Sequence, residues 1–246
     1  SLNYLGTYAF SWNDFTGRLV IPLSLEEIPA SCFSSCLKIT EVVIPEGVVK
    51  IGEEAFYRVG IRTVIFPESL RIIDDSAFEG SNYSGHLVLP SNIEYIGERA
   101  FAFTQITGID FPEGLTFCGE SAFYFDKELS GVLEFPASLK VIPDDCFAYC
   151  SKLEGLVIPS GLESIGSYAF RGCTSLAAIT SKALVPPVMD SNNVFDEVPK
   201  DNFALEVPEE SINAYRSAPY WNEFKRISSY SGFVCRPSSA NVLNAG

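Results

Sequence analysis

The chain has 246 residues, of which 47% are hydrophobic and 20% are charged, enough apolar material for one large domain or two ordinary ones. Its formal net charge of −14 argues against nucleic-acid binding, which needs clustered Lys and Arg, and against docking on anionic lipid. Since no apolar run approaches the roughly 18 residues of a membrane span, we expect no membrane insertion by this segment.

A repeat of 22–24 residues is the strongest signal in the sequence. One phenylalanine marks each unit, at Phe10, Phe33, Phe56, Phe78, Phe101, Phe123, Phe147 and Phe170, with a looser ninth copy at Phe195. Prolines run in parallel, each 11 residues before a phenylalanine, at Pro22, Pro45, Pro67, Pro90, Pro112, Pro136 and Pro159. The distance from a phenylalanine to the next proline varies, so we expect length changes to be confined to that half of the unit.

Each unit predicts a short strand, a turn and a second extended piece. Alternation rich in Val and Ile precedes the proline, which ends the strand because it cannot donate to a ladder. Pro-x-Gly or Pro-x-Ser, as at residues 45–47 and 67–69, is turn chemistry. Aliphatic residues three and six positions after the proline favour the second extended piece, and the Ala-Phe segment, as at residues 55–56, predicts a single helical turn. Stacked units would share a core that no unit forms alone.

The beginning of the chain lies within a repeat. Leu5 and Phe10 already occupy repeat slots, and residues 1–10 lack the basic start and long apolar run of a signal peptide. Because the open end of a solenoid exposes core and needs a cap, we expect the natural protein to carry further residues before Ser1.

Three stretches, IPEGVVKIGEEAF (44–56), LPSNIEYIGERAF (89–101) and IPSGLESIGSYAFRGC (158–173), resemble the BspA-like (Treponema-type) leucine-rich repeat. The resemblance covers residues 1–180. It implies an α/β repeat protein, namely a right-handed solenoid with short strands on one face. It also implies a bacterial cell-surface or secreted protein used for adhesion and protein recognition.

The end of the chain departs from the repeat. Residues 181–230 are expected to hold a degenerate last repeat and a helical cap, because an amphipathic helix interrupted by Pro219 would bury large side chains. These side chains are Tyr215, Trp221, Phe224 and Ile227. Residues 231–246 are small and polar, which indicates a linker or the first strand of a downstream domain, such as an immunoglobulin-like one.

Six of the seven cysteines occupy repeat slots that suit a small buried side chain. Cys36, Cys150 and Cys173 follow the phenylalanine by three positions, Cys32 and Cys146 directly precede it, and Cys118 replaces a core isoleucine. Since a zinc site would need a second close pair, we expect structural free thiols, no metal and no cofactor. Cys235, in the tail, has no assigned role.

His86 is the only histidine, so a Ser-His-Asp or Cys-His nucleophile would have to use it. It occupies a strand slot held elsewhere by Arg18, Glu41 and Thr63, which indicates an ordinary surface position. The sequence has no phosphate-binding glycine loop or Gly-x-Ser-x-Gly elbow, and a single histidine excludes a His-Glu-x-x-His metal site. We therefore expect a protein that is not an enzyme.

Acidic residues recur three positions before the phenylalanine, at Glu53, Asp75, Glu98, Glu120 and Asp144. Stacking would bring them about 5 Å apart. One explanation is a cation-binding ridge. The other, which we favour, is the preference of acids for the partly positive start of a helical turn.

The expected binding face is the column two residues before each proline. Four adjacent strands would carry an apolar stripe, Val20, Val43, Ile65 and Val88, flanked by Arg18, Glu41, Thr63 and His86 and continued by Asp110, Glu134 and Val157. β-branched residues on a sheet face are also ordinary strand chemistry. A contiguous exposed apolar patch otherwise marks a partner site.

Three functions follow from these features. The first is a non-catalytic surface or secreted recognition module that binds a host or bacterial surface protein or a glycan through the strand face. The second is a spacer or presentation arm of a longer surface protein. The third, least favoured, is a glycan-acting hydrolase, which would need two carboxylates across a cleft.

Overall fold

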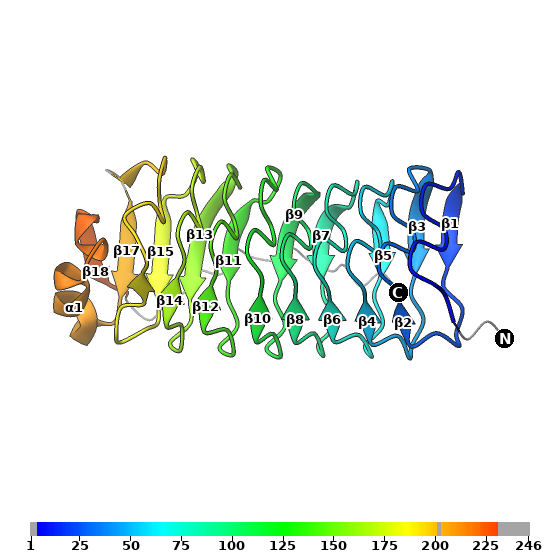
Figure 1. Cartoon of the computed structure of the whole chain (residues 1–246). Helices are drawn as coiled ribbons and strands as arrows, with labels where there is room; N and C mark the ends of the chain where they lie inside the picture. Colours follow the sequence, from blue (N-terminus) through cyan, green and yellow to red (C-terminus); the bar gives the residue numbers. More distant parts are fainter. Residues whose placement is uncertain (1–3, 201–202, 231–246) are drawn as a thin grey trace, which may run out of the picture.

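The computed structural model describes residues 4–200 and 203–230 and is a parallel β-solenoid of about nine coils (Figure 1). One 22–24-residue repeat makes one coil, and each coil places one short strand on each of two faces. This confirms the leucine-rich-repeat solenoid expected from the sequence.

The strands that precede the prolines form the surface called the strand face below. They are β1 (Gly17–Val20), β3 (Ile39–Val43), β5 (Thr63–Ile65), β7 (Ser84–Val88), β9 (Gln105–Asp110), β11 (Gly131–Glu134), β13 (Leu153–Ile158), β15 (Ala178–Ser181), β17 (Ala204–Val207) and β18 (Arg226–Ser229). Parallel hydrogen bonding joins β1-β3-β5, β7-β9 and β11-β13-β15-β17-β18.

Two-residue strands after the prolines form the opposite sheet. They are β2 (Glu27–Ile28), β4 (Lys50–Ile51), β6 (Ile72–Ile73), β8 (Tyr95–Ile96), β10 (Phe117–Cys118), β12 (Val141–Ile142), β14 (Ser164–Ile165) and β16 (Val188–Met189). They pair in parallel as β2-β4-β6-β8-β10 and β12-β14-β16.

The strand pairing between coils is irregular where three of the strand-face strands begin. The pairing register shifts directly after Gly17, Gly85 and Gly131. These glycines have φ values of 80°, 92° and 76°, a left-handed region that glycine enters at little cost. These shifts lie between a phenylalanine and the next proline, in the half of the unit whose length varies between repeats.

The Ala-Phe segment is not a helical turn, contrary to the prediction from sequence. It is a run of β-turns in which Glu54 and Arg58, on either side of Phe56, both have a left-handed φ of 52°. Phe56 N donates to Ala77 O of the next coil at 2.8 Å, whereas Ala55 N bonds within its own coil. Alternate N–H groups of the segment, on Glu54, Phe56 and Arg58, donate to carbonyl oxygens of the next coil, which creates a further hydrogen-bonded ladder between coils.

The repeated phenylalanines stack in single file through the core. From Phe10 to Phe195, neighbouring ring centroids lie 5.3–5.7 Å apart with ring planes within 15° of parallel. From Phe33 onward these rings are at most 2% exposed. The looser ninth copy therefore belongs to the stack.

The glycine that follows the second extended piece permits close approach of neighbouring coils. A Cβ at Gly119 would lie 2.4 Å from Glu98 N and 2.5 Å from Gly97 C. We expect Gly119→Ala to lower the free energy of unfolding by about 2 kcal/mol, measured by urea denaturation. A Cβ at Gly6 meets no atom within 4 Å, so Gly6→Ala is the matched control. Equal effects of the two substitutions would contradict the close approach.

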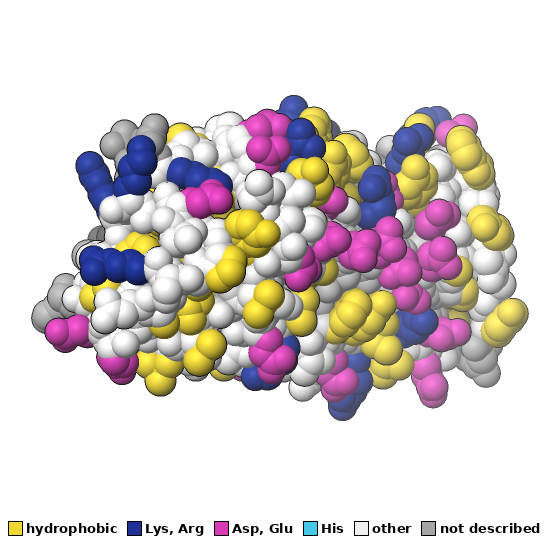
Figure 2. Space-filling model, turned by 60° about the vertical axis from the view of Figure 1, so that its left-hand side comes forward, with side chains coloured by type: hydrophobic (Ala, Val, Ile, Leu, Met, Phe, Trp, Pro, Cys, Tyr) yellow, Lys and Arg dark blue, Asp and Glu magenta, His cyan; other side chains and the backbone are white. Residues whose placement is uncertain are grey.

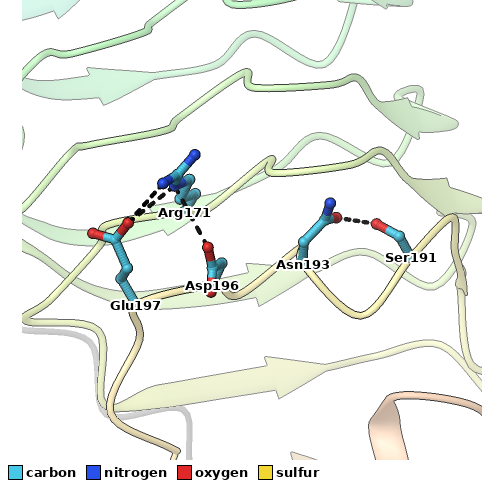
Figure 3. Close-up of polar contacts among 5 residues, drawn as sticks. All are labelled: Arg171, Ser191, Asn193, Asp196 and Glu197. Atoms are coloured by element: carbon cyan, nitrogen blue, oxygen red, sulfur yellow. Dashed lines mark hydrogen bonds and ion pairs between the residues drawn. The ribbon is translucent and has the colours of Figure 1, made fainter.

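The ninth coil is joined to the eighth by polar contacts as well as by the core. Figure 3 shows Arg171 pointing toward Glu197 and Asp196. Its guanidinium donates twice to Glu197 Oε1, at 3.0 and 2.9 Å, and lies 3.6 Å from Asp196 Oδ2. In the same coil Ser191 Oγ donates to Asn193 Oδ1. Because exposed ion pairs contribute little to the free energy of unfolding, we expect these two coils to be held together mainly by core packing, including the stacking of Phe170 on Phe195.

Helix is a minor component: η2 (Glu209–Ser211), α1 (Ile212–Ser217) and η3 (Trp221–Glu223). The prediction of Ile227 on an amphipathic helix is wrong, because Ile227 lies on β18, which extends the strand-face sheet beside β17. None of the helices in the described ranges has the length and apolarity required to cross a bilayer. Residues 231–246, with Cys235, lie outside the described residues.

Candidate functional site

The structure places the predicted apolar stripe, Val20, Val43, Ile65 and Val88, on the outer side of the strand face. Val20, Ile65 and Val88 are 59%, 56% and 62% exposed, and Val43 is half-buried. The register sets Val20 opposite Val43 and Val43 opposite Ile65. Between Ile65 and Val88 the strand pairing is interrupted, since β5 and β7 belong to different sheets.

The predicted flanking residues lie beside this stripe and pair across strands. Arg18 Nε lies 3.2 Å from Glu41 Oε1, and the register aligns Glu41 with Thr63. His86 Nε2 lies 2.9 Å from Asp110 Oδ2 on the next strand. Exposed ion pairs add at most about 1 kcal/mol each, so these pairs matter here mainly by fixing the charge along the edge of the stripe.

The stripe ends in the middle of the solenoid. Val88 aligns with Asp110, and Glu134 aligns with Val157. Val157, expected in the outward column, is only 6% exposed. Lys182 Nζ, two coils away, reaches Glu134 Oε1 at 2.8 Å and so crosses the strand that carries Val157. The strand face therefore has an apolar first half and a more polar, partly acidic second half.

A pocket of about 610 Å³ adjoins the first residue of the stripe. Its lining includes Leu5, Phe10, Phe15, Leu19, Val20 and Phe33. Val20 thus belongs both to the apolar stripe and to this largely apolar hollow.

The acidic column has a structural explanation that differs from the predicted one. Asp75 Oδ1 accepts a hydrogen bond from Glu98 N at 2.8 Å, and Asp144 Oδ1 accepts one from Ser167 N at 2.7 Å. The favoured explanation, a helical-turn dipole, is wrong because the segment contains no helical turn. Figure 2 shows acidic side chains gathered in a band along one face. Over the described ranges, no group of three or more His, Cys, Asp or Glu side chains is placed to hold a metal ion.

A second exposed apolar row, on the opposite sheet, was missed in the sequence. Phe117 and Val141 are 46% and 45% exposed, and the Tyr95 and Phe117 rings stack at 4.6 Å. The signal was present, since an apolar residue precedes the core isoleucine slot in several units. This row provides matched positions for testing the strand face.

An aromatic cluster on the turn side was also missed. The Phe103 ring lies 5.4 Å from the rings of Tyr124 and Phe125, and Phe125 lies 5.9 Å from Tyr149. Lys127 Nζ sits 4.0 Å from the Phe125 ring centroid. Arg99 and Arg171 likewise lie over the rings of Phe103 and Tyr149. Because these cations occupy ring faces, the cluster offers fewer free faces for a ligand than its aromatic content suggests.

Asp126 is a carboxyl group buried in the core of the solenoid. It is 0% exposed, and its Oδ1 accepts hydrogen bonds from Thr104 N at 2.7 Å and Thr104 Oγ1 at 2.9 Å. Its Oδ2 is buried without a partner. Burial raises the pKa of the Asp126 carboxyl well above its usual range, and the bonds from Thr104 oppose this only in part. Its slot, three after the phenylalanine, is the slot of Cys150 and Cys173.

The six described cysteines are buried, and none of them forms a disulfide in the structure. Burial raises the pKa of the Cys32 thiol to about 11 and that of Cys173 to about 12. Because the thiolate is the reactive form, the raised pKa values of Cys32 and Cys173 disfavour thiol chemistry at these two residues in the folded protein.

Several solved structures are similar to this chain. A leucine-rich repeat protein from Bacteroides ovatus is 22% identical over 89% of this chain and 72% of its own, with a TM-score of 0.49. One from Eubacterium ventriosum is 15% identical over 87% and 72%, with a TM-score of 0.48. The leucine-rich repeat protein of T. pallidum is 22% identical over 70% of each chain, with a TM-score of 0.44.

Family assignment rests on the repeat itself. The family described as BspA type leucine-rich repeat region (6 copies) matches residues 3–130 and 125–188. No curated protein matches the chain. The matched residues span most of the chain and contain the proline and phenylalanine slots that build the coils, and the chain therefore belongs to the BspA-type leucine-rich-repeat family.

Proposed function

We propose that this chain is a non-catalytic recognition module of a cell-surface or secreted protein and that it binds a protein partner through the apolar stripe. The observation that carries the proposal is the exposure of Val20, Ile65 and Val88, each more than half exposed, at the same position of successive coils on the strand face. A row of exposed aliphatic side chains costs solvation free energy unless a partner covers it.

The chemistry of the stripe favours a protein over a glycan. Its side chains are aliphatic and would pack against apolar side chains of a partner, as in the centre of protein interfaces. The Arg18–Glu41 ion pair and the His86–Asp110 contact lie at its edge, where polar groups form the rim of an interface. Parallel strand pairing holds Val20, Val43 and Ile65 in register within one sheet, and Val88 lies on the paired strands β7 and β9, so binding needs little ordering of this surface.

The C-terminal segment is part of the same proposal, as the cap of an α/β solenoid. Tyr215 and Trp221 are 0% and 1% exposed. The Tyr215 hydroxyl shares a hydrogen bond of 2.6 Å with Ser181 Oγ, and Trp221 Nε1 donates to Pro187 O at 2.8 Å. By covering the last coil, residues 203–230 would keep the core dry while leaving the strand face open. The surface or secreted location rests on the family.

Introducing negative charges into the apolar stripe tests the proposed function. The Ile65→Glu/Val88→Glu double variant is expected to bind its partner at least about 100-fold more weakly, because it buries two unpaired carboxylates in the interface. The chain would be immobilised and exposed to extracellular protein fractions, and bound proteins would be quantified by mass spectrometry. Both residues are exposed, so the thermal midpoint should stay nearly unchanged.

The matched control is Val141→Glu/Val188→Glu, which places the same charges at exposed valines of the opposite sheet, 45% and 64% exposed. We expect this variant to bind the partner protein as tightly as the wild type does. If both double variants bind normally, the strand face is not the contact surface, and a spacer or presentation arm becomes the better account.

A further inference from the structure

Two cysteines from neighbouring coils lie against each other in the core. Cys118 ends β10 in a slot that other coils fill with isoleucine, and Cys146 precedes Phe147 in a slot that others fill with alanine. Their Sγ atoms are 3.6 Å apart, and the residues are 6% and 0% exposed. A disulfide needs about 2.05 Å, so a closing movement of less than about 2 Å, shared between two side chains, would join them.

The same junction is where strand pairing stops on both faces. Within the described residues, β9 is not paired with β11, and β10 is not paired with β12. Pro143 explains part of the interruption. At its slot in the adjacent coils, Gly119 N donates to Ile96 O and Gly166 N to Ile142 O, both at 2.8 Å, whereas proline has no N–H to donate.

Packing is also incomplete at this junction. A small void, too narrow for a water molecule, is lined by residues that include Phe111, Cys118, Phe135 and Cys146. Atoms that face a void lose dispersion contacts. The turn ladder persists, with Phe123 N donating to Cys146 O at 2.9 Å. Since a solenoid holds together only through contacts between neighbouring coils, the loss of strand pairing on both faces weakens this junction.

We infer that Cys118 and Cys146 form a disulfide that staples the two coils together when the protein folds in an oxidising environment. The bond would compensate for the missing strand pairing at this junction. It would also close a loop across one full coil, since the two cysteines are 28 positions apart. A cross-link of this kind removes conformations from the unfolded chain and stabilises the fold.

The oxidant is a disulfide compound, such as oxidised glutathione. The Cys118 thiolate attacks one sulfur of that disulfide, forms a mixed disulfide and releases one thiolate. The Cys146 thiolate then attacks the Cys118 sulfur and releases the second thiolate. The protein loses two electrons and two protons, and the oxidant becomes two thiols. Burial raises the pKa of the Cys146 thiol well above its usual range, so exchange takes place while the junction is still open, during folding.

The test is folding of the full chain in a mixture of reduced and oxidised glutathione. Remaining thiols are then alkylated in denaturant, and masses are measured intact and after proteolysis. Two of the seven cysteines are expected to be protected, with one linked peptide pair containing Cys118 and Cys146. The thermal midpoint of the oxidised protein should exceed that of the reduced protein by roughly 5 °C or more.

Cys118→Ile, which restores the residue of the other coils, should show no protected pair and no response to the oxidant while folding normally. Cys32→Ala, a change to the usual residue of its slot, should keep the Cys118–Cys146 link. If all seven thiols of the wild-type protein are alkylated in denaturant after it has folded with oxidised glutathione, the inference is overturned, as it is by a link between any other pair. Neither result bears on the apolar stripe.

Discussion

Replacement of Phe101 by alanine is expected to lower the free energy of unfolding by about 3–5 kcal/mol, the usual cost of removing a buried phenylalanine ring. The ring is 0% exposed and stacks at 5.3 Å on Phe78 and at 5.6 Å on Phe123. The cavity would lie in the middle of the stack, where it weakens the contact with both neighbouring coils. Urea denaturation followed by circular dichroism measures the change.

The matched control is Phe103→Ala, two residues along the same coil. Phe103 is 41% exposed and outside the core stack, so its removal should cost less than about 1.5 kcal/mol. In a linear array a weakened centre uncouples the two halves, and we expect Phe101→Ala to unfold over a broader urea range than the wild type. Similar losses from both substitutions would contradict the stacked core.

The second large effect is expected at Asp126, where Asp126→Asn should stabilise the protein at pH 8 by on the order of 2 kcal/mol or more. Asparagine keeps an oxygen to accept both hydrogen bonds from Thr104 but removes an ionisable group that is 0% exposed. Leaving a buried polar atom unsatisfied costs about 1–3 kcal/mol, and more when it is charged. Urea denaturation at several pH values measures the difference.

The pH dependence has a defined sign. Folding raises the pKa of Asp126 above its unfolded value, which is about 3.9. The folded protein therefore holds this proton more tightly than the unfolded chain does. The contribution of the protonated Asp126 to the free energy of unfolding is fully present below about pH 4, and it is lost as the pH rises toward the folded pKa. The advantage of Asp126→Asn should grow with pH across that range. Asp14→Asn, at an exposed ion pair with Lys38, should show little change. A constant or shrinking advantage of Asp126→Asn would contradict the burial of this carboxyl.

The sequence predicted the coil well because the core slots repeat. The fixed spacing of 11 residues between proline and phenylalanine predicted that Ile51 and Phe56 lie in the core, and both are 0% exposed. The same spacing predicted that Ile65 points outward. The turn ladder was missed because non-glycine residues occupy its left-handed positions, such as Arg58 and Phe125. Only Gly80 and Gly172, in the same slot, hinted at that conformation.

Other features depend on residues that no local pattern connects. Val157 is buried on the strand that lies between Glu134 and Lys182, which are 48 positions apart and form an ion pair. Asp126 looks like a surface acid until it is aligned with the buried Cys150. Of the candidate binding face, the sequence therefore predicted which residues project outward but not where the stripe ends.

Site-specific photocrosslinking tests the central claim most directly, namely that the apolar stripe contacts a protein partner. A photoreactive amino acid would replace Ile65 or Val88 on the strand face, and Val141 or Val188 on the opposite sheet, each in otherwise unchanged protein. After illumination in an extracellular protein fraction, we expect the same partner protein to be crosslinked at position 65 and at position 88, and no protein to be crosslinked at the other two positions. Crosslinks of equal yield from both sheets, or from the opposite sheet alone, would contradict it.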